Sequence, residues 1–161
     1  INPNFSGGYS TRTNNEIELP LSWAEMKNTF GHFTASNLID KNIGNFAHTN
    51  AVPDGIWIRV YLTEVSWITK IVVYNRLHDC CMSRIEGLTL FIKSGYDIVR
   101  NCGTIAVSKD VYKFDCAGWG DVVELSKEGR VTSQNIAEIM VYQRNTSNGE
   151  YSMEYRVGCH F

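Results

Sequence analysis

The chain lacks an excess of charge of either sign. Its formal net charge is -2, and charged residues make up only 20% of it. Proteins that bind nucleic acids usually gather lysine and arginine into clusters and have a high isoelectric point. Because neither feature is present, the composition argues against a nucleic-acid partner.

Long apolar runs are also missing. No stretch of about 18 apolar residues occurs, so the sequence predicts no transmembrane helix. The first residues, Ile1-Asn2-Pro3-Asn4, contain neither the charged nor the apolar region of a secretory leader, and we expect any such leader to have been removed. The 161 residues and 43% hydrophobic content predict one domain, spanning 1–161, with a core of its own.

The motifs of common hydrolases are absent as well. The sequence has no Gly-x-Ser-x-Gly and no His-Glu-x-x-His, and nothing places two acidic residues as a glycosidase pair. His78 lies close to Cys80 in the sequence, which suggests a thiol nucleophile, but a cysteine held in a disulfide is not nucleophilic. We therefore expect a binding protein and not an enzyme.

Short β-branched and aromatic segments, separated by Gly, Asn and Asp, dominate the chain. At this spacing they predict antiparallel strands in a sandwich or barrel. Only Ser22–Lys27 suggests a helical turn, with Ser22 as its N-cap and Glu25 at the capping-box position. The core pattern leaves out residues 1–15 and 143–161. The expected strands are 56–62, 67–74, 88–93, 110–116, 121–125 and 136–142.

Two adjacent cysteines, Cys80 and Cys81, lie between Arg76 and Arg84. Neighbouring cysteines can close only a small, rigid ring. Its weakly apolar surface would cover the C–H face of a sugar, while the two guanidinium groups donate to the sugar oxygens. The alternative is a surface ion pair in which Asp79 binds one of the arginines.

The pairing of the remaining cysteines is partly readable. If the adjacent pair is bonded, Cys102 and Cys116 are left to bridge a hairpin, and Cys159 remains. In the alternative, Cys159 bonds to one of these and the adjacent pair is reduced. An unpaired Cys159 would support a covalent homo-oligomer.

Several features are typical of an extracellular protein. Secreted proteins keep their disulfides oxidised, whereas cytosolic proteins rarely have them. The glycosylation sequons at Asn4 and Asn145 are compatible with a secreted glycoprotein. We therefore expect the protein to be secreted.

A polar loop precedes the first strong strand. It contains Asn37, Asp40 and Asn42, and Thr49 follows shortly afterwards. Carbonyl and carboxylate oxygens in a tight loop are the ligands that Ca²⁺ prefers. A second carboxylate would have to come from elsewhere in the fold, and Glu138 is the candidate. The alternative is an Asn/Asp-rich turn without a metal.

Taken together, these segments resemble the F-type lectins (fucolectins), within the discoidin-like fold of coagulation-factor C-type domains. The resemblance covers roughly residues 16–142, and the double cysteine between arginines is its most specific element. It implies an all-β fold, an antiparallel eight-stranded jelly-roll sandwich, and binding of terminal L-fucose or a related sugar on glycans. The segments that carry it are 35–42, 57–62, 71–87 and 137–142.

The family's sugar site follows the pattern of a histidine, a spacer and Arg-x-Asp-x4-Arg. Carried onto this sequence, it implies sugar contacts from His48, Arg76, Asp79, Cys80, Cys81 and Arg84, with Phe46 as an apolar wall and His78 as a further contact. The resemblance also implies a structural Ca²⁺ held by carbonyls of Asn37, Asn42 and Ala137, by Thr49, and by the carboxylates of Asp40 and Glu138.

The chain departs from the family pattern in three places. The segment from Arg76 to Asp79 is one residue longer than Arg-x-Asp, and the loop between Phe46 and Trp57 is shorter than usual. The disulfide that often ties this loop to the last strand has lost both cysteines, and Ala137 stands at the last-strand position.

These departures leave a second function open. A discoidin-like adhesion module would keep the scaffold but bind a protein or a lipid headgroup through its loops. Apolar side chains exposed at the loop tips, Gly44–Ala47 and Ala51–Pro53, would favour that function.

Overall fold

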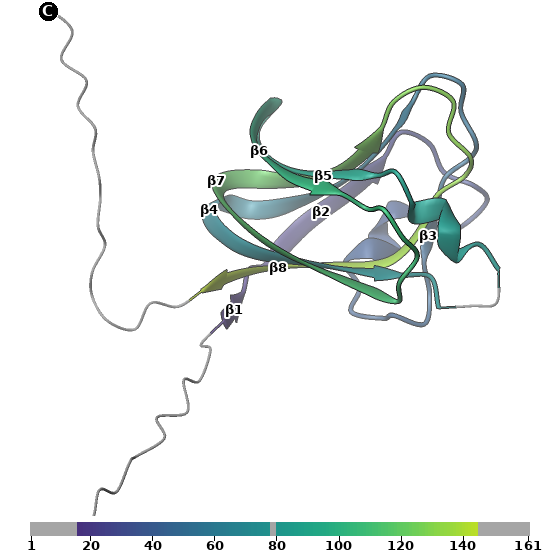
Figure 1. The fold of residues 1–161 in the computed structure, drawn as a ribbon. Coiled ribbons are helices and arrows are strands. Elements are labelled where there is room, and N and C mark those ends of the chain that lie inside the picture. Colours follow the sequence, from purple (N-terminus) through teal and green to yellow (C-terminus); the bar gives the residue numbers. More distant parts are fainter. Residues whose placement is uncertain (1–15, 78–79, 145–161) are drawn as a thin grey trace, which may run out of the picture.

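The computed structural model describes residues 16–77 and 80–144, and it is an antiparallel eight-stranded all-β fold, as predicted (Figure 1). No helix within these residues is long and apolar enough to cross a membrane. The strands are β1 (Glu16–Glu18), β2 (Leu21–Met26), β3 (Ala47–His48), β4 (Ile56–Asn75), β5 (Thr89–Ser94), β6 (Asp97–Thr104), β7 (Val111–Lys127) and β8 (Asn135–Arg144). Two short 3-10 helices are η1 (Ala35–Leu38) and η2 (Met82–Ile85).

The strands form a sandwich of two layers because β4 and β7 run through both. The first half of β4 pairs with β2 and with the second half of β7, whereas its second half pairs with β8. Irregular register after Tyr61 and after Ile68 accompanies the passage of β4 from one layer to the other. The first layer is therefore β2-β4-β7-β5-β6, and the second is β7-β4-β8, with β1 and β3 on the free edge of β8.

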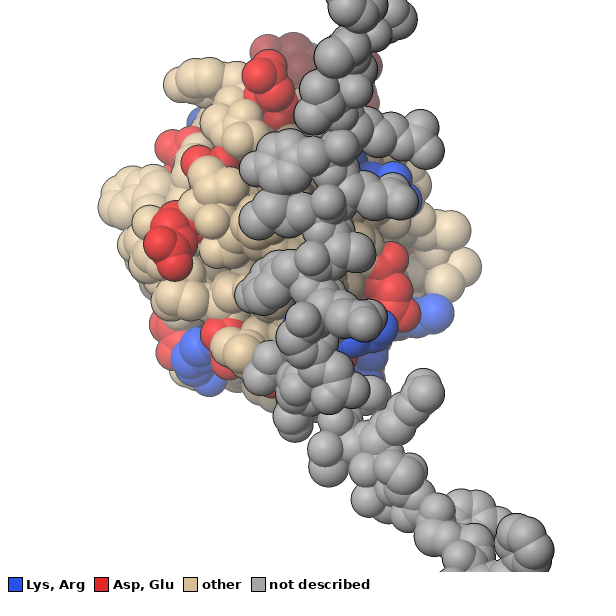
Figure 2. All heavy atoms as spheres, turned by 90° about the vertical axis from the view of Figure 1, so that its left-hand side faces the viewer, with Lys and Arg blue, Asp and Glu red and all other residues tan. Residues whose placement is uncertain are grey.

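The face drawn in Figure 2 shows no gathering of charge among its described residues. Figure 2 presents the end of the sandwich where β4 and β7 bend, and its visible lysines, arginines and acidic residues are scattered among uncharged side chains. This agrees with the near-balanced charge of the sequence.

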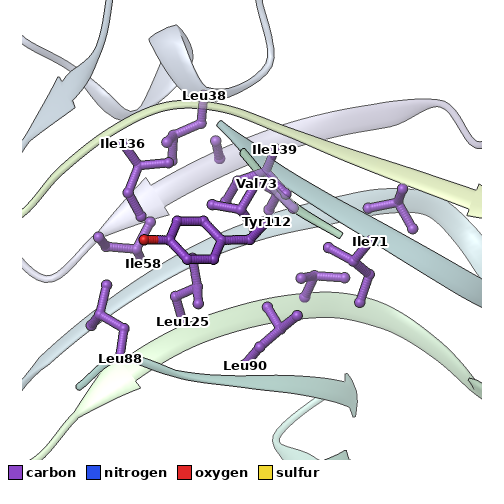
Figure 3. Packing of buried hydrophobic residues seen from close by; sticks show 14 of the residues in the cluster. Leu38, Ile58, Ile71, Val73, Leu88, Leu90, Tyr112, Leu125, Ile136 and Ile139 are labelled. Carbon is purple, nitrogen blue, oxygen red and sulfur yellow. The ribbon is translucent and has the colours of Figure 1, made fainter. Parts of the chain in front are cut away.

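The core lies between the two layers. Side chains of the first layer, such as Leu90 and Leu125, meet Ile71 and Ile139 of the second (Figure 3). All four are fully buried. Burial of this apolar surface is the main force that holds the layers together.

The strand prediction was incomplete in one respect and wrong in another. Segments 56–62 and 67–74 belong to one strand, β4, and segments 110–116 and 121–125 belong to β7. The helical turn predicted over Ser22–Lys27 is wrong, because this segment forms β2. Its partner β4 supplies backbone hydrogen bonds and a buried position for Ala24, and this pairing overrides the local capping signal.

Both predicted disulfides, Cys80–Cys81 and Cys102–Cys116, are present. The second was expected to bridge a hairpin, but β6 and β7 are not neighbours in the sheet. Cys102 lies in the first layer, and Cys116 lies in the half of β7 that pairs with the second-layer part of β4. The bond therefore joins the two layers. The predictions for Asn4, His78, Asp79, Asn145 and Cys159 fall outside the described residues.

Candidate functional site

Arg76 and Arg84 are held side by side by a buried amide. Asn75, the last residue of β4, is fully buried and donates from Nδ2 to the carbonyls of Met82 (2.9 Å) and Lys109 (3.1 Å). Its Oδ1 accepts the backbone N–H of Arg76 at 2.8 Å. Because Met82 begins η2, which carries Arg84, this amide fixes the end of β4 against the second arginine.

His48 is positioned from both sides. It pairs with Asn135 of β8, and its backbone N–H donates to the carbonyl of Phe33 (3.0 Å) while its own carbonyl accepts from Phe30 (2.8 Å). The short loop that follows is closed by a bridge between Val52 and Val131. His48 is only 8% exposed, so the shortened loop still places this histidine within the fold and beside the arginines.

Asn135 joins these groups into one cluster, and the sequence analysis missed it. Its Oδ1 accepts hydrogen bonds from Nη1 of Arg76 (3.3 Å) and from Nη1 of Arg84 (3.4 Å), and its Nδ2 donates to the carbonyl of Cys81 (3.4 Å). The same Nη1 of Arg84 lies 3.2 Å from Nε2 of His48. We call His48, Arg76, Arg84 and Asn135, together with the Cys80–Cys81 bond, the cationic cluster.

The surroundings of His48 favour its neutral imidazole. Burial lowers the pKa of His48 from its ordinary value, and the positive charges of Arg84 and Arg76 lower it further. Arg84 has only donors, so Nε2 of His48 must accept and the ring proton must sit on Nδ1. The cluster therefore offers donors from two guanidinium groups beside an unprotonated ring nitrogen.

The ring of Phe46 packs against the guanidinium group of Arg76. The guanidinium carbon of Arg76 lies 4.0 Å from the centroid of the Phe46 ring, and Phe33 stacks on the same ring at 4.7 Å. Such cation–π contact restricts the guanidinium without using its hydrogen-bond donors. The Nε–H of Arg76 is buried and has no partner among the described residues, so this donor is free. Phe46 itself is buried and supports Arg76, a role that its expected place in an apolar wall did not include.

The adjacent cysteines stand at the edge of the cluster. Cys81 has a left-handed backbone conformation, with φ of 79°, and its carbonyl accepts from the backbone N–H of Arg84 (3.2 Å) as well as from Asn135. Cys80 is exposed and Cys81 is half-buried. The Cys80–Cys81 disulfide is thus open to solvent beside the guanidinium groups. That arrangement can receive a small polyol with one apolar face.

A second polar group lies on the loop after η1. The backbone N–H of Asn42 donates to Oδ1 of Asp40 (2.9 Å), and Nδ2 of Asn45 donates to Oδ2 (2.6 Å). The backbone N–H of Lys41, a residue with φ of 65°, donates to Oε2 of Glu138 (3.2 Å). Asp40 and Glu138 thereby meet, as the sequence analysis expected, and we call this group the acidic pair.

The acidic pair fits a hard cation. Glu138 is fully buried, and its Oε1 has no hydrogen-bond partner among the described residues. Burial raises the pKa of Glu138 to about 7, and the neighbouring charge of Asp40 adds to the effect. A divalent ion would balance the negative charge of both carboxylates and bind the unpaired Oε1 of Glu138.

The other predicted calcium ligands make hydrogen bonds of their own. Asn37 donates from Nδ2 to the carbonyl of Phe46 (2.9 Å), which closes the loop, and Asn42 accepts through Oδ1 from the backbone of Gly44 (3.0 Å). The carbonyl of Asn42 accepts the backbone N–H of Asn45 (3.4 Å). Ala137 precedes Glu138 on β8, and Thr49 contacts Gln134 through Oγ1 (2.9 Å).

Solved structures share this fold, although no family model and no curated protein sequence matches the chain. The lectin domain of lectinolysin complexed with Lewis B antigen aligns with a TM-score of 0.70 and 20% identity, over 76% of this chain and 93% of that one. The family 32 carbohydrate-binding module of C. perfringens NanJ, in complex with galactose, gives 0.64 and 23%, over 80% and 99%.

An F-lectin (fucolectin) from striped bass (Morone saxatilis) serum gives a TM-score of 0.67 and 23% identity, over 76% of this chain and 45% of that one. At these identities the likeness establishes the fold. The chain has the discoidin-like jelly roll that F-type lectins and family 32 modules share.

Proposed function

We propose that this protein is a secreted, non-catalytic lectin that binds terminal L-fucose or a related sugar on glycans through the cationic cluster. The observation that carries the proposal is the convergence of Arg76 and Arg84 on one buried amide, Asn135, with His48 in contact with Arg84, beside the Cys80–Cys81 disulfide. The three polar side chains are fixed before any ligand arrives, which limits the entropy lost on binding.

Each part of the cluster has a role toward a sugar. The remaining Nη donors of Arg76 and Arg84, which are both half-buried, would bind hydroxyl and ring oxygens. The Cys80–Cys81 bond would cover the apolar face of the ring. Solved structures of the same fold are complexed with Lewis B antigen and with galactose, which supports a sugar as the ligand class.

We further propose that the acidic pair holds a structural Ca²⁺. The carboxylates of Asp40 and Glu138 would bind it with carbonyls of Asn37, Asn42 and Ala137 and with Thr49. The unpaired oxygen of buried Glu138 supports this assignment. The ion would supply positive charge to a loop whose Phe46 supports Arg76, so metal and sugar sites would be coupled through that loop.

The adhesion alternative receives less support. In the first of the two loop tips that would have served it, Phe46 and Ala47 are buried, whereas Ala51 and Pro53 of the second are exposed. The exposed alanine and proline are small, so they offer little apolar area for a lipid or protein partner.

A glycan array tests the proposal. We expect the wild-type protein to bind fucosylated glycans, and we expect Arg84→Ala to lose that binding while it remains folded. Arg100→Ala is the matched control, because Arg100 is exposed on β6 and takes no part in the cluster. An array on which the wild-type protein binds no glycan would refute the lectin assignment. A wild-type array repeated with a calcium chelator tests the ion separately.

A further inference from the structure

The outer face of the first layer has an unusual set of polar residues. Glu124 is only 6% exposed, and its Oε2 accepts from Nε of Arg59 (2.5 Å) and from Nζ of Lys93 (3.1 Å). Lys93 is itself only 7% exposed. Trp57 covers the guanidinium of Arg59 at 4.0 Å. Such buried charges rarely add stability in comparison with apolar residues of the same volume.

One member of this polar network, Arg59, lines a pocket. A cavity of about 220 Å³ is lined by Arg59, Tyr61, Val122 and Asp121, and by the turn that connects β5 to β6. Because Arg59 is fixed by Glu124 and Trp57, its remaining donors are held in place at the pocket floor. Tyr61 donates to Glu25 beside it, so the phenol oxygen can still accept.

An exposed aromatic ring forms the rim. Tyr96, in the turn between β5 and β6, exposes 90% of its surface. The turn is tied to the pocket because the N–H of Gly95 donates to Oδ1 of Asp121 at 2.9 Å, and Gly95 supplies the positive φ, 58°, that the turn requires. The exposed ring presents an apolar face and a hydroxyl group to a ligand at the pocket.

A second exposed aromatic residue lies across the same face. Trp23 is opposite Tyr61 in the register of β2 and β4, Tyr61 is opposite Val122, and Val122 is opposite Lys93. This row spans three strand spacings, about 14 Å. Trp23 is largely exposed. The face therefore has an aromatic ring at each end and fixed polar groups between them.

We infer that this outer face is a second binding site, for a short neutral oligosaccharide, separate from the cationic cluster. Aromatic rings at the ends would stack on the C–H faces of sugar rings, and Arg59, Tyr61 and Asp121 would bind hydroxyl groups. Three carboxylates and two cations line the face, and this near balance disfavours both anionic and cationic ligands.

The inference does not depend on the proposed fucose site, and its test keeps the two apart. Nitrogen-labelled Arg84→Ala protein is titrated, in an NMR experiment, with maltotriose, cellotriose and xylotriose. We expect at least one trisaccharide to shift the backbone amides of Tyr96, Asp121 and Gly95. Methyl α-L-fucoside, added to the wild-type protein, should instead shift the amides of Arg84 and Asn135.

Variants of the rim give the decisive comparison. Tyr96→Ala should weaken the trisaccharide by about 5- to 10-fold, whereas Tyr96→Phe, which keeps the ring, should bind as the parent does. The inference is overturned if none of the three sugars shifts these amides, or if the shifts persist unchanged in Tyr96→Ala combined with Asp121→Asn.

Discussion

Two polar groups of opposite character are anchored three residues apart on β8. Asn135 belongs to the cationic cluster, and Glu138 belongs to the acidic pair. Among the described residues, every polar atom of the Asn135 side chain has a partner, whereas Oε1 of the equally buried Glu138 has none. The amide at the centre of the first group is fully paired before a ligand binds. The second is incomplete until a proton or a cation supplies its missing partner.

This difference predicts how the two groups respond to their ligands. In the cationic cluster the side chains are already ordered, so substitutions there should lower sugar affinity more than they lower the stability of the ligand-free protein. In the acidic pair two carboxylates repel each other, so binding an ion should appear mainly as a gain in stability. The following substitutions test this division, from the largest expected effect to the smallest.

Arg84→Ala should have the largest effect. Arg84 contacts both His48 and Asn135, and truncating one member of a buried, charge-assisted contact costs about 2–5 kcal/mol. Affinity for methyl α-L-fucoside, measured by isothermal titration calorimetry, should therefore fall by on the order of 100-fold or more. Arg76→Ala should lose less, because Phe46 and Asn135 remain to shape the site. Equal losses of affinity in Arg84→Ala and Arg76→Ala would contradict the prediction that Arg84 contributes more to sugar binding.

Glu138→Gln should abolish the effect of Ca²⁺ on stability, which distinguishes the role of the ion from that of the sugar. With saturating Ca²⁺ at about 100 times its dissociation constant, wild-type stability should rise by about 2.7 kcal/mol. For a domain of this size that corresponds to a rise in melting temperature of about 5–10 °C. The variant should show no such rise. In a chelator it should be at least as stable as the wild type, because it removes a buried carboxylate whose Oε1 has no partner among the described residues.

Glu64→Gln is the control for this change, since Glu64 is an exposed glutamate outside the acidic pair. Differential scanning calorimetry with and without chelator measures all three proteins. A wild-type melting temperature indifferent to the chelator would show that no stabilising ion is bound.

Asn135→Ala should disturb both properties moderately. It leaves the carbonyl of Cys81 without one donor and removes the shared acceptor of Arg76 and Arg84. Loss of such buried hydrogen bonds costs about 1–3 kcal/mol of unfolding free energy, measured in urea. Sugar affinity should fall by less than in Arg84→Ala, because both arginines are still present. Unchanged affinity would mean that Asn135 does not position them.

Much of the site was readable from the sequence because its residues lie in distinctive local patterns. The adjacent cysteines between Arg76 and Arg84 and the spacing of His48 drew attention to residues that the structure brings together. Asp40 and Glu138 are far apart in the chain, yet they lie close together, as expected. The adjacent cysteines are a rare local pattern, whereas the places of His48 and of the calcium ligands followed from the resemblance to the F-type lectins.

Other features had no local signal. Asn135 begins an ordinary apolar strand, and only its pairing with His48 and the tertiary approach of η2 give it a role. The continuity of β4 and β7 through both layers was also hidden, because bulges and bends interrupt the alternation that marks a strand. Ser22–Lys27 shows the converse, since a local helix signal lost to pairing with β4.

The double substitution of Cys80 and Cys81 by alanine should have the smallest effect and sharpens the comparison further. The closed ring constrains only two neighbouring residues, so its loss should leave the melting temperature nearly unchanged. Removing the Cys102–Cys116 bond in the same way should instead cost about 3 kcal/mol, because that bond closes a longer loop and joins the two layers.

For sugar affinity, the loss of the Cys80–Cys81 bond should have the larger effect of the two. The alanine pair at 80 and 81 should weaken methyl α-L-fucoside several-fold, because the rigid apolar step beside Arg84 is lost, while the pair at 102 and 116 should bind as the wild type does at a temperature where it is folded. If the first variant binds the sugar with unaltered affinity, the Cys80–Cys81 disulfide is not part of the binding surface, and the two arginines with His48 must account for recognition alone.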